Sequence, residues 1–185
     1  MHPQLQLVVA EFAAAQERLH RLAAAVPDEW WALRPDPARW SIGECVAHLN
    51  LAAEAYLPLI RRGIVEGRTL GRAPAARFRR DPIGWLLWRT MGPPVRHRVR
   101  TTAPFVPSAD EPRAGTLETF DRLQSEQVRA VEEADGLPLG RIRITSPFDS
   151  RVHYNLFSCL TILPRHQQRH LWQAEQVLEG LRRAR

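Results

Sequence analysis

Apolar residues recur every three or four positions through four separate segments of the chain, and this spacing limits what the chain can fold into. Such a repeat lines one face of a helix, and that face must be buried against another element. In the segment from Gln4 to Ala25 the repeat consists of Leu5, Val8, Val9, Phe12, Leu19, Leu22 and Ala23. Because 185 residues suffice to bury a hydrophobic core, the pattern predicts one all-α domain spanning residues 1–185.

A second helix is predicted to begin at a well-defined residue. Ser41 followed by Glu44 forms a capping box, in which the serine side chain accepts from a free backbone N–H and the glutamate reaches back. Pro58 is expected to kink this helix, and Gly63 and Gly67 are expected to end it. Its apolar stripe is Ile42, Cys45, Val46, Leu49, Ala52, Ala53, Tyr56, Leu59 and Ile60.

Two more amphipathic helices are predicted in the second half of the chain. One has Thr116 as its N-cap and Gly136 as its terminator, and its inner stripe is Leu117, Phe120, Gln124, Val128 and Val131. After a brief extended stretch at 141–144, the other begins near Asn155, and Pro164 is expected to bend it. Its stripe is Leu156, Leu160, Leu163, Gln167, Leu171, Ala174, Leu178 and Leu181. Four such helices indicate a four-helix bundle.

Residues 68–113 form a long insertion between the second and third of these helices. Proline, glycine and arginine dominate it, and its one apolar cluster, which follows Pro82, predicts a single short helix. Ordinary connections have about four to six residues, so an insertion of this length is expected to be a lid or an interface.

Arginine is concentrated between Arg61 and Arg100, where eleven arginines face only Glu66 and Asp81. A solvated connecting segment is the favoured interpretation. The alternative is a surface that attracts phosphates, nucleic acid or acidic lipid.

The two cysteines, Cys45 and Cys159, lie far apart and have no CxxC partner. This spacing excludes a disulfide framework and a cysteine zinc knuckle, and it fits a reducing compartment. No signal-like N-terminal segment and no run of about 18 apolar residues occurs. A cytoplasmic protein without a membrane span is therefore expected.

Three histidines carry the strongest chemical signal. His166 and His170 are four residues apart, so a helix places both imidazoles on one face, one turn apart. His48 occupies a matching position beside the apolar stripe of the second helix. Spacing alone favours isolated histidines satisfied by hydrogen bonds. A zinc protease helix of the H-E-x-x-H type is excluded, because Gln167 stands where that chemistry needs glutamate.

The stretch WSIGECVAHL at 40–49, preceded by Arg34-Pro35, occurs together with His166-x-x-x-His170-Leu171-x-Gln173. This combination resembles the DinB-like (YfiT-like) metalloprotein superfamily over nearly the whole chain. The resemblance implies a helical bundle with a three-histidine metal site that leaves coordination positions open. By that resemblance His48, His166 and His170 are the metal ligands, and a homodimer is expected.

Three neutral imidazoles at an open site suit zinc, nickel or ferrous iron. The resemblance implies a hydrolase or a low-molecular-weight-thiol S-transferase, in which the metal activates a water or a thiol for attack on a small-molecule substrate. Gln173 is a candidate for orienting that water or substrate, although packing explains it equally well.

Two other functions remain open. One is a non-catalytic metal-binding or stress-response module, and the less favoured one is nucleic-acid binding through the arginine-rich insertion. Of the remaining polar residues, Glu44 is assigned to the helix cap, Cys45 to the apolar stripe, and His153 to a loop.

Overall fold

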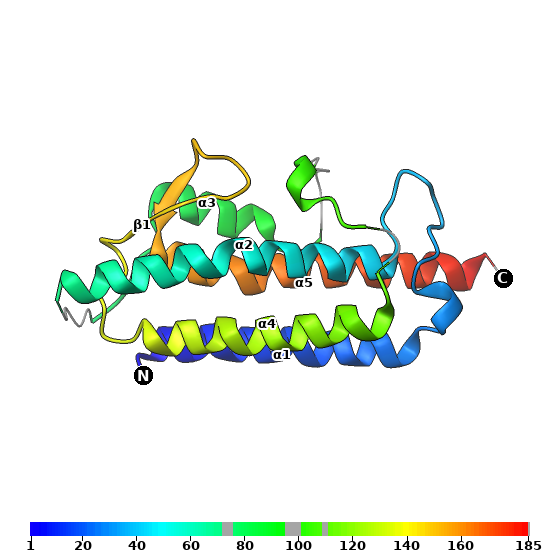
Figure 1. Cartoon of the computed structure of the whole chain (residues 1–185), viewed down its shortest axis with the longest axis horizontal. Coiled ribbons are helices and arrows are strands. Elements are labelled where there is room, and N and C mark those ends of the chain that lie inside the picture. The colour runs from blue at the N-terminus through cyan, green and yellow to red at the C-terminus, as the bar shows by residue number, and fades with distance from the viewer. Residues whose placement is uncertain (72–75, 95–100, 109–110, 185) are drawn as a thin grey trace.

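The structure is a computed structural model that describes residues 1–71, 76–94, 101–108 and 111–184. Four long helices lie along one another as a bundle (Figure 1), which confirms the predicted all-α architecture. They are α1 (Pro3–Ala25), α2 (Ile42–Thr69), α4 (Arg113–Glu133) and α5 (Leu156–Arg183). The shorter elements are η1 (Asp28–Trp30), α3 (Pro82–Met91), η2 (Ala103–Phe105), β1 (Arg143–Thr145) and β2 (His153–Asn155).

The order of the helices around the bundle is α1, α4, α2, α5. Helices α2 and α4 are neighbours and run parallel, because residues that contact each other keep nearly the same separation in sequence along both helices. Asn50 donates to the carbonyl of Thr116, Arg61 pairs with Glu126, and Arg68 pairs with Glu133. Figure 1 shows both helices running in the same direction.

This topology explains the length of the 68–113 stretch. A helix of 28 residues such as α2 is about 42 Å long, and the chain must return along that length before a parallel α4 can begin. On the way it forms α3, which packs on α5, and η2, which contacts α2. The stretch is therefore the crossover connection that the bundle requires, and the short helix predicted after Pro82 is confirmed as α3.

Two predicted helix ends are wrong, one because of a non-local contact and the other because of a local one. Helix α2 continues through Gly63 and Gly67 to Thr69. A Cβ atom at Gly67 would lie only 2.7 Å from the side chain of Ile142, so this glycine permits close packing instead of ending the helix. Helix α4 begins at Arg113, and the hydroxyl of Thr116 donates to the Pro112 carbonyl inside the first turn instead of capping it.

The extended stretch predicted at 141–144 is one strand of a small hairpin. Strand β1 pairs antiparallel with β2, with Ile144 opposite Tyr154. His153, expected in a loop, lies in β2, where its Nδ1 contacts the hydroxyl of Thr145 at 3.0 Å. The sequence predicts part of β1 but not its partner β2, which has only three residues.

A polar layer divides the hydrophobic core into two clusters. One cluster contains Phe12 of α1, Ala53 of α2 and Leu163 of α5, whereas the other contains Ala15, Leu49 and Leu171 of the same helices. Between them lies a set of buried polar side chains that we call the polar layer: His48, Asn50, Gln124, His166, Gln167 and His170. The candidate site is part of this layer.

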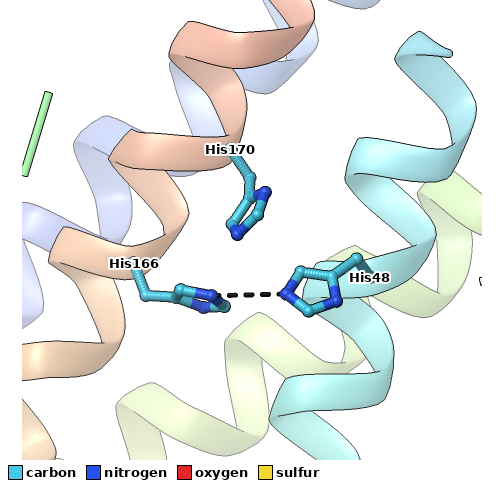
Figure 2. Close-up of side chains that lie close together, drawn as sticks. All are labelled: His48, His166 and His170. Carbon is cyan, nitrogen blue, oxygen red and sulfur yellow. Dashed lines mark hydrogen bonds between the residues drawn. The ribbon is translucent and has the colours of Figure 1, made fainter. Parts of the chain in front are cut away.

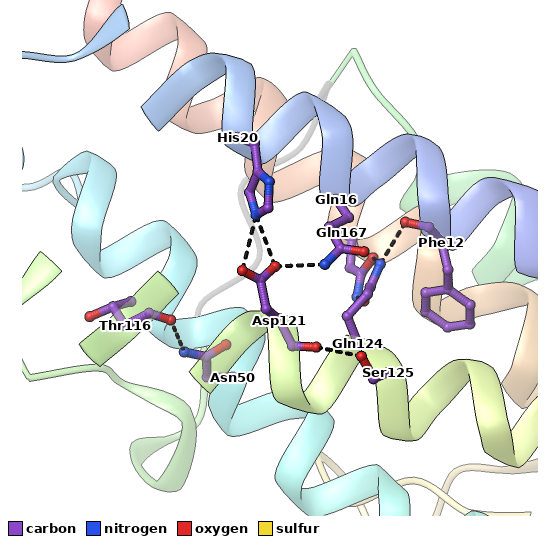
Figure 3. A network of polar contacts seen from close by, with 9 residues as sticks. All are labelled: Phe12, Gln16, His20, Asn50, Thr116, Asp121, Gln124, Ser125 and Gln167. Carbon is purple, nitrogen blue, oxygen red and sulfur yellow. Dashed lines mark hydrogen bonds and ion pairs between the residues drawn. The ribbon is translucent and has the colours of Figure 1, made fainter. Parts of the chain in front are cut away.

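The glutamines of the polar layer satisfy each other. The Gln124 amide donates to the backbone carbonyl of Phe12 at 2.6 Å, and the Gln167 amide donates to the side-chain oxygen of Gln124 at 2.7 Å (Figure 3). This pairing explains why two glutamines occupy positions in otherwise apolar stripes, because a buried amide is tolerated when its hydrogen bonds are made.

Glu44 stabilises the start of α2, the helix that carries His48. The predicted capping box is present: Ser41 N–H donates to Glu44, and Glu44 N–H donates to the Ser41 hydroxyl. The guanidinium of Arg34 also donates to the Glu44 carboxylate, whose side chain is 1% exposed. Burial raises the pKa of Glu44, but the hydrogen bonds from Arg34 and Ser41 outweigh it and hold the pKa below 4.5.

A pH-dependent loss of stability is expected in Glu44→Gln. A depressed carboxylate pKa stabilises the fold above about pH 4.5, and that contribution is lost as the pH falls through the folded-state pKa. At pH 7 the variant should therefore be about 1–3 kcal/mol less stable than the wild type, and the difference should shrink as the pH is lowered to 3. Urea unfolding at both pH values measures this.

Glu17→Gln is the matched control, because Glu17 pairs with Arg21 while both side chains are largely exposed. Its effect should stay within about 0.5 kcal/mol at either pH. A stability difference for Glu44→Gln that is equal at pH 7 and pH 3 would contradict the assigned role of the carboxylate.

Candidate metal centre

His48 lies in the second turn of α2 and is held by a backbone group of the crossover connection. Its Nδ1 donates to the carbonyl oxygen of Phe105, in η2, at 2.8 Å. A carbonyl accepts only from a protonated nitrogen, so in the neutral ring Nε2 carries the free lone pair. This is the arrangement by which a second group fixes the tautomer of a metal-binding histidine.

His166 and His170 face His48 from consecutive turns of α5 (Figure 2). The ring centroid of His170 lies 4.4 Å from that of His48 and 4.6 Å from that of His166. The Nε2 atoms of His48 and His166 are 3.3 Å apart. One ring nitrogen from each of the three lies within 4.8 Å of the others. The structure therefore brings together the three residues that the sequence singles out.

The geometry fits a divalent metal ion. Two nitrogens bonded to zinc at 2.0–2.1 Å with a tetrahedral angle are separated by about 3.3–3.4 Å, and the Nε2 atoms of His48 and His166 are 3.3 Å apart. Nδ1 of His170 is buried, and none of the described residues makes a hydrogen bond to it. A buried nitrogen without a hydrogen-bond partner is uncommon in a folded protein and occurs where a site takes up an ion or a water.

Burial keeps the three imidazoles in the neutral form that binds metals. It lowers the pKa of His48, although the Phe105 carbonyl works in the opposite direction. Burial together with the neighbouring histidines and Arg169 places the pKa values of His166 and His170 well below 6.5. Gln173 lies close enough to His170 to raise its pKa against this trend. At pH 7 all three rings are uncharged, as metal coordination requires.

Three aromatic side chains from three different loops cover the histidines. Trp40, from the connection between α1 and α2, lies 4.9 Å from the His48 ring. Phe148, between the two strands, lies 6.1 Å from both His48 and His166, and Phe105 stacks on it at 4.0 Å. Sequence reasoning missed Phe105 and Phe148, because a single aromatic residue in a loop has no periodic signal.

A sequence model of the DinB superfamily matches residues 11–174 of the chain. The chain belongs to the DinB superfamily. The match contains all three histidines and Gln173, and it extends from α1 into α5. No curated protein and no solved structure is similar enough to the chain to match it.

In the described part of this DinB-superfamily protein, the three histidines are the one group of side chains that could hold a metal ion. Cys45, three residues before His48, lies in the core, and burial raises the pKa of its thiol to about 12. A thiol that stays protonated is not a nucleophile at neutral pH, and Cys45 is not among the ligand atoms that lie together. The assignment of Cys45 to the apolar stripe agrees with its burial.

The arginine-rich stretch of this DinB-superfamily protein is partly neutralised by the bundle. Arg61 and Arg68, at its start, pair with carboxylates of α4. Arg80 donates to Thr161 and stacks on Trp88 at 4.1 Å. None of the helices in the described residues is long and apolar enough to cross a membrane. Superfamily membership and the buried histidine cluster together fit a metal-dependent function.

Proposed function

We propose that this protein is a metal-dependent enzyme of the hydrolase or low-molecular-weight-thiol S-transferase kind. His48, His166 and His170 would hold a zinc, nickel or iron ion. The observation that carries the proposal is the convergence of three neutral imidazoles, from α2 and α5, within 4.8 Å of one another. A bound ion would supply Lewis-acid chemistry that lowers the pKa of a water or a thiol, making the anion available at neutral pH.

The protein's own groups would orient the ligands and shape the space around them. The Phe105 carbonyl fixes the tautomer of His48, and position on one helix face fixes the separation of His166 and His170. Trp40 and Phe148 border the rings and exclude bulk water, which strengthens electrostatic interactions inside the site. Gln173, beside His170, would orient the substrate or the nucleophile through its amide.

The proposal predicts an activity that depends on His48. Metal-loaded wild-type protein is assayed with a panel of low-molecular-weight thiols against an electrophilic arene, and separately with activated esters. Turnover in His48→Ala should fall by at least about 100-fold, because the nucleophile loses its activation. His153→Ala, in β2 and outside the cluster, should keep wild-type turnover.

A second candidate is a non-catalytic metal-binding module, and one observation favours it. The three histidines are only 1%, 8% and 6% exposed, so little of the cluster is open to a substrate in this conformation. Stoichiometric metal binding with no turnover of any thiol or ester would select the module. The homodimer and the cytoplasmic location implied by sequence remain predictions.

A further inference from the structure

Helix α3 is apolar on two opposite sides, and only one of them is buried. Leu87, Trp88 and Met91 pack against the bundle core, and the backbone at Gly84 lies directly against Ser158. At 100° per residue these positions fall on one side of the helix. On the other side Ile83, Trp85 and Leu86 are 47%, 53% and 55% exposed.

This outer face is a patch, whereas other exposed apolar residues occur singly. Three large apolar side chains lie within four consecutive residues of a ten-residue helix. Single exposed apolar residues, such as Leu7 and Val65, are ordinary on a protein surface. A contiguous group beside charged residues is typical of an interaction site.

Arginines that form no salt bridge with another described residue lie near the N-terminal end of α3 and on the helix itself. Arg77, Arg79 and Arg141 line a cleft of about 590 Å³ at the N-terminal end of the helix. Arg89 lies on the outer side of α3 itself. None of these four arginines forms a salt bridge with another described residue, in contrast to Arg61, Arg68 and Arg122 of the bundle.

The acidic residue that lines this cleft is outnumbered by arginines. Asp81 supplies one negative charge, and its carboxylate accepts from the backbone N–H groups of Gly84 and Asn155. Four arginines line the same cleft: Arg77, Arg79, Arg80 and Arg141. The cleft and the outer face of α3 therefore combine apolar side chains with an excess of positive charge.

We propose that the outer face of α3 and the adjacent arginine cleft bind the surface of an anionic membrane. Ile83, Trp85 and Leu86 enter the boundary between headgroups and acyl chains, where tryptophan and aliphatic side chains partition favourably. The arginines bind lipid phosphates, and each contributes about fivefold to partitioning. A second copy of this chain fits the surface poorly, since a symmetric contact would bring two sets of unpaired arginines together.

Sedimentation with lipid vesicles tests the proposal on the full chain. Wild-type protein should bind vesicles containing about 30 mol % phosphatidylglycerol at least about tenfold better than vesicles of phosphatidylcholine alone. High salt should weaken this binding, because it screens the arginines. No binding to the anionic vesicles, or equal binding to both compositions, would overturn the proposal.

Paired variants locate the binding surface. Ile83→Ser with Leu86→Ser should lower binding to the anionic vesicles at least about tenfold. The matched control, Leu7→Ser with Val65→Ser, removes two apolar residues elsewhere that are more exposed than Ile83 and Leu86, and it should bind as the wild type does. Thermal unfolding of both double variants verifies that they fold. Arg77→Ser with Arg79→Ser tests the arginine cleft independently of the apolar outer face of α3.

Two further results would overturn the proposal, because they would show that this surface binds a second copy of the chain or that vesicles bind elsewhere. One is a wild-type dimer that becomes monomeric in the Ile83→Ser, Leu86→Ser variant, measured by light scattering during gel filtration. The other is vesicle binding that survives in both the apolar and the arginine double variants.

Discussion

Alanine at His48, His166 or His170 is expected to lower the affinity for zinc by at least about 100-fold. Two remaining imidazoles cannot complete the coordination that three supply, and no carboxylate of the described residues belongs to the group. Metal content after purification without chelator should fall from one ion per chain to near zero in each variant. Titration against a chromophoric chelator then measures the affinities.

His20→Ala is the control for these variants, because His20 pairs with Asp121 on the outside of the bundle (Figure 3). It should bind metal as the wild type does. Zinc at 100 times its dissociation constant should also raise the free energy of unfolding of the wild type by about 2.7 kcal/mol. Wild-type protein that binds no divalent ion, or a triple variant that still binds one, would contradict the assignment.

Replacing Gln124 by leucine is expected to destabilise the fold by about 2–3 kcal/mol. The substitution removes the donor to Phe12 and leaves the amide of Gln167 buried without its partner. Replacing both glutamines by leucine should cost clearly less than the sum of the two single changes, because no unsatisfied amide remains. Urea unfolding of the four proteins, analysed as a double-mutant cycle, gives the coupling energy.

Gln16→Leu is the matched control, because Gln16 donates to the partly exposed Asp121 on the surface and is not part of the polar layer. Its cost should stay below about 1 kcal/mol. Strict additivity of the Gln124 and Gln167 changes would mean that the two amides do not depend on each other.

The individual helices of this protein could be predicted from the sequence because their signals are local. The capping box of Ser41 and Glu44 and the apolar stripes depend on residues three or four apart. The parallel direction of α2 and α4 could not be predicted in this way, since it depends on contacts between residues about 65 positions apart. Gly67 was misinterpreted for the same reason, because its close neighbour is Ile142.

The candidate site likewise has parts with a local sequence signal and parts without one. The spacing of His166 and His170 is local, whereas their convergence with His48 was implied by the resemblance to the DinB-like superfamily. The acceptor that orients His48 had no signal, because it is a backbone carbonyl and every residue has one. The covering role of Phe148 depends on a hairpin whose second strand, β2, is too short to detect from the sequence.

The contact between His48 and Phe105 places an unusual demand on the crossover connection. Since the acceptor belongs to the main chain, residue 105 can change identity without removing it. Adding or deleting residues between α2 and α4 would instead shift the carbonyl out of register with the imidazole. Tolerance of substitution at residue 105 would therefore be no guide to tolerance of insertion nearby, because only an insertion displaces the acceptor.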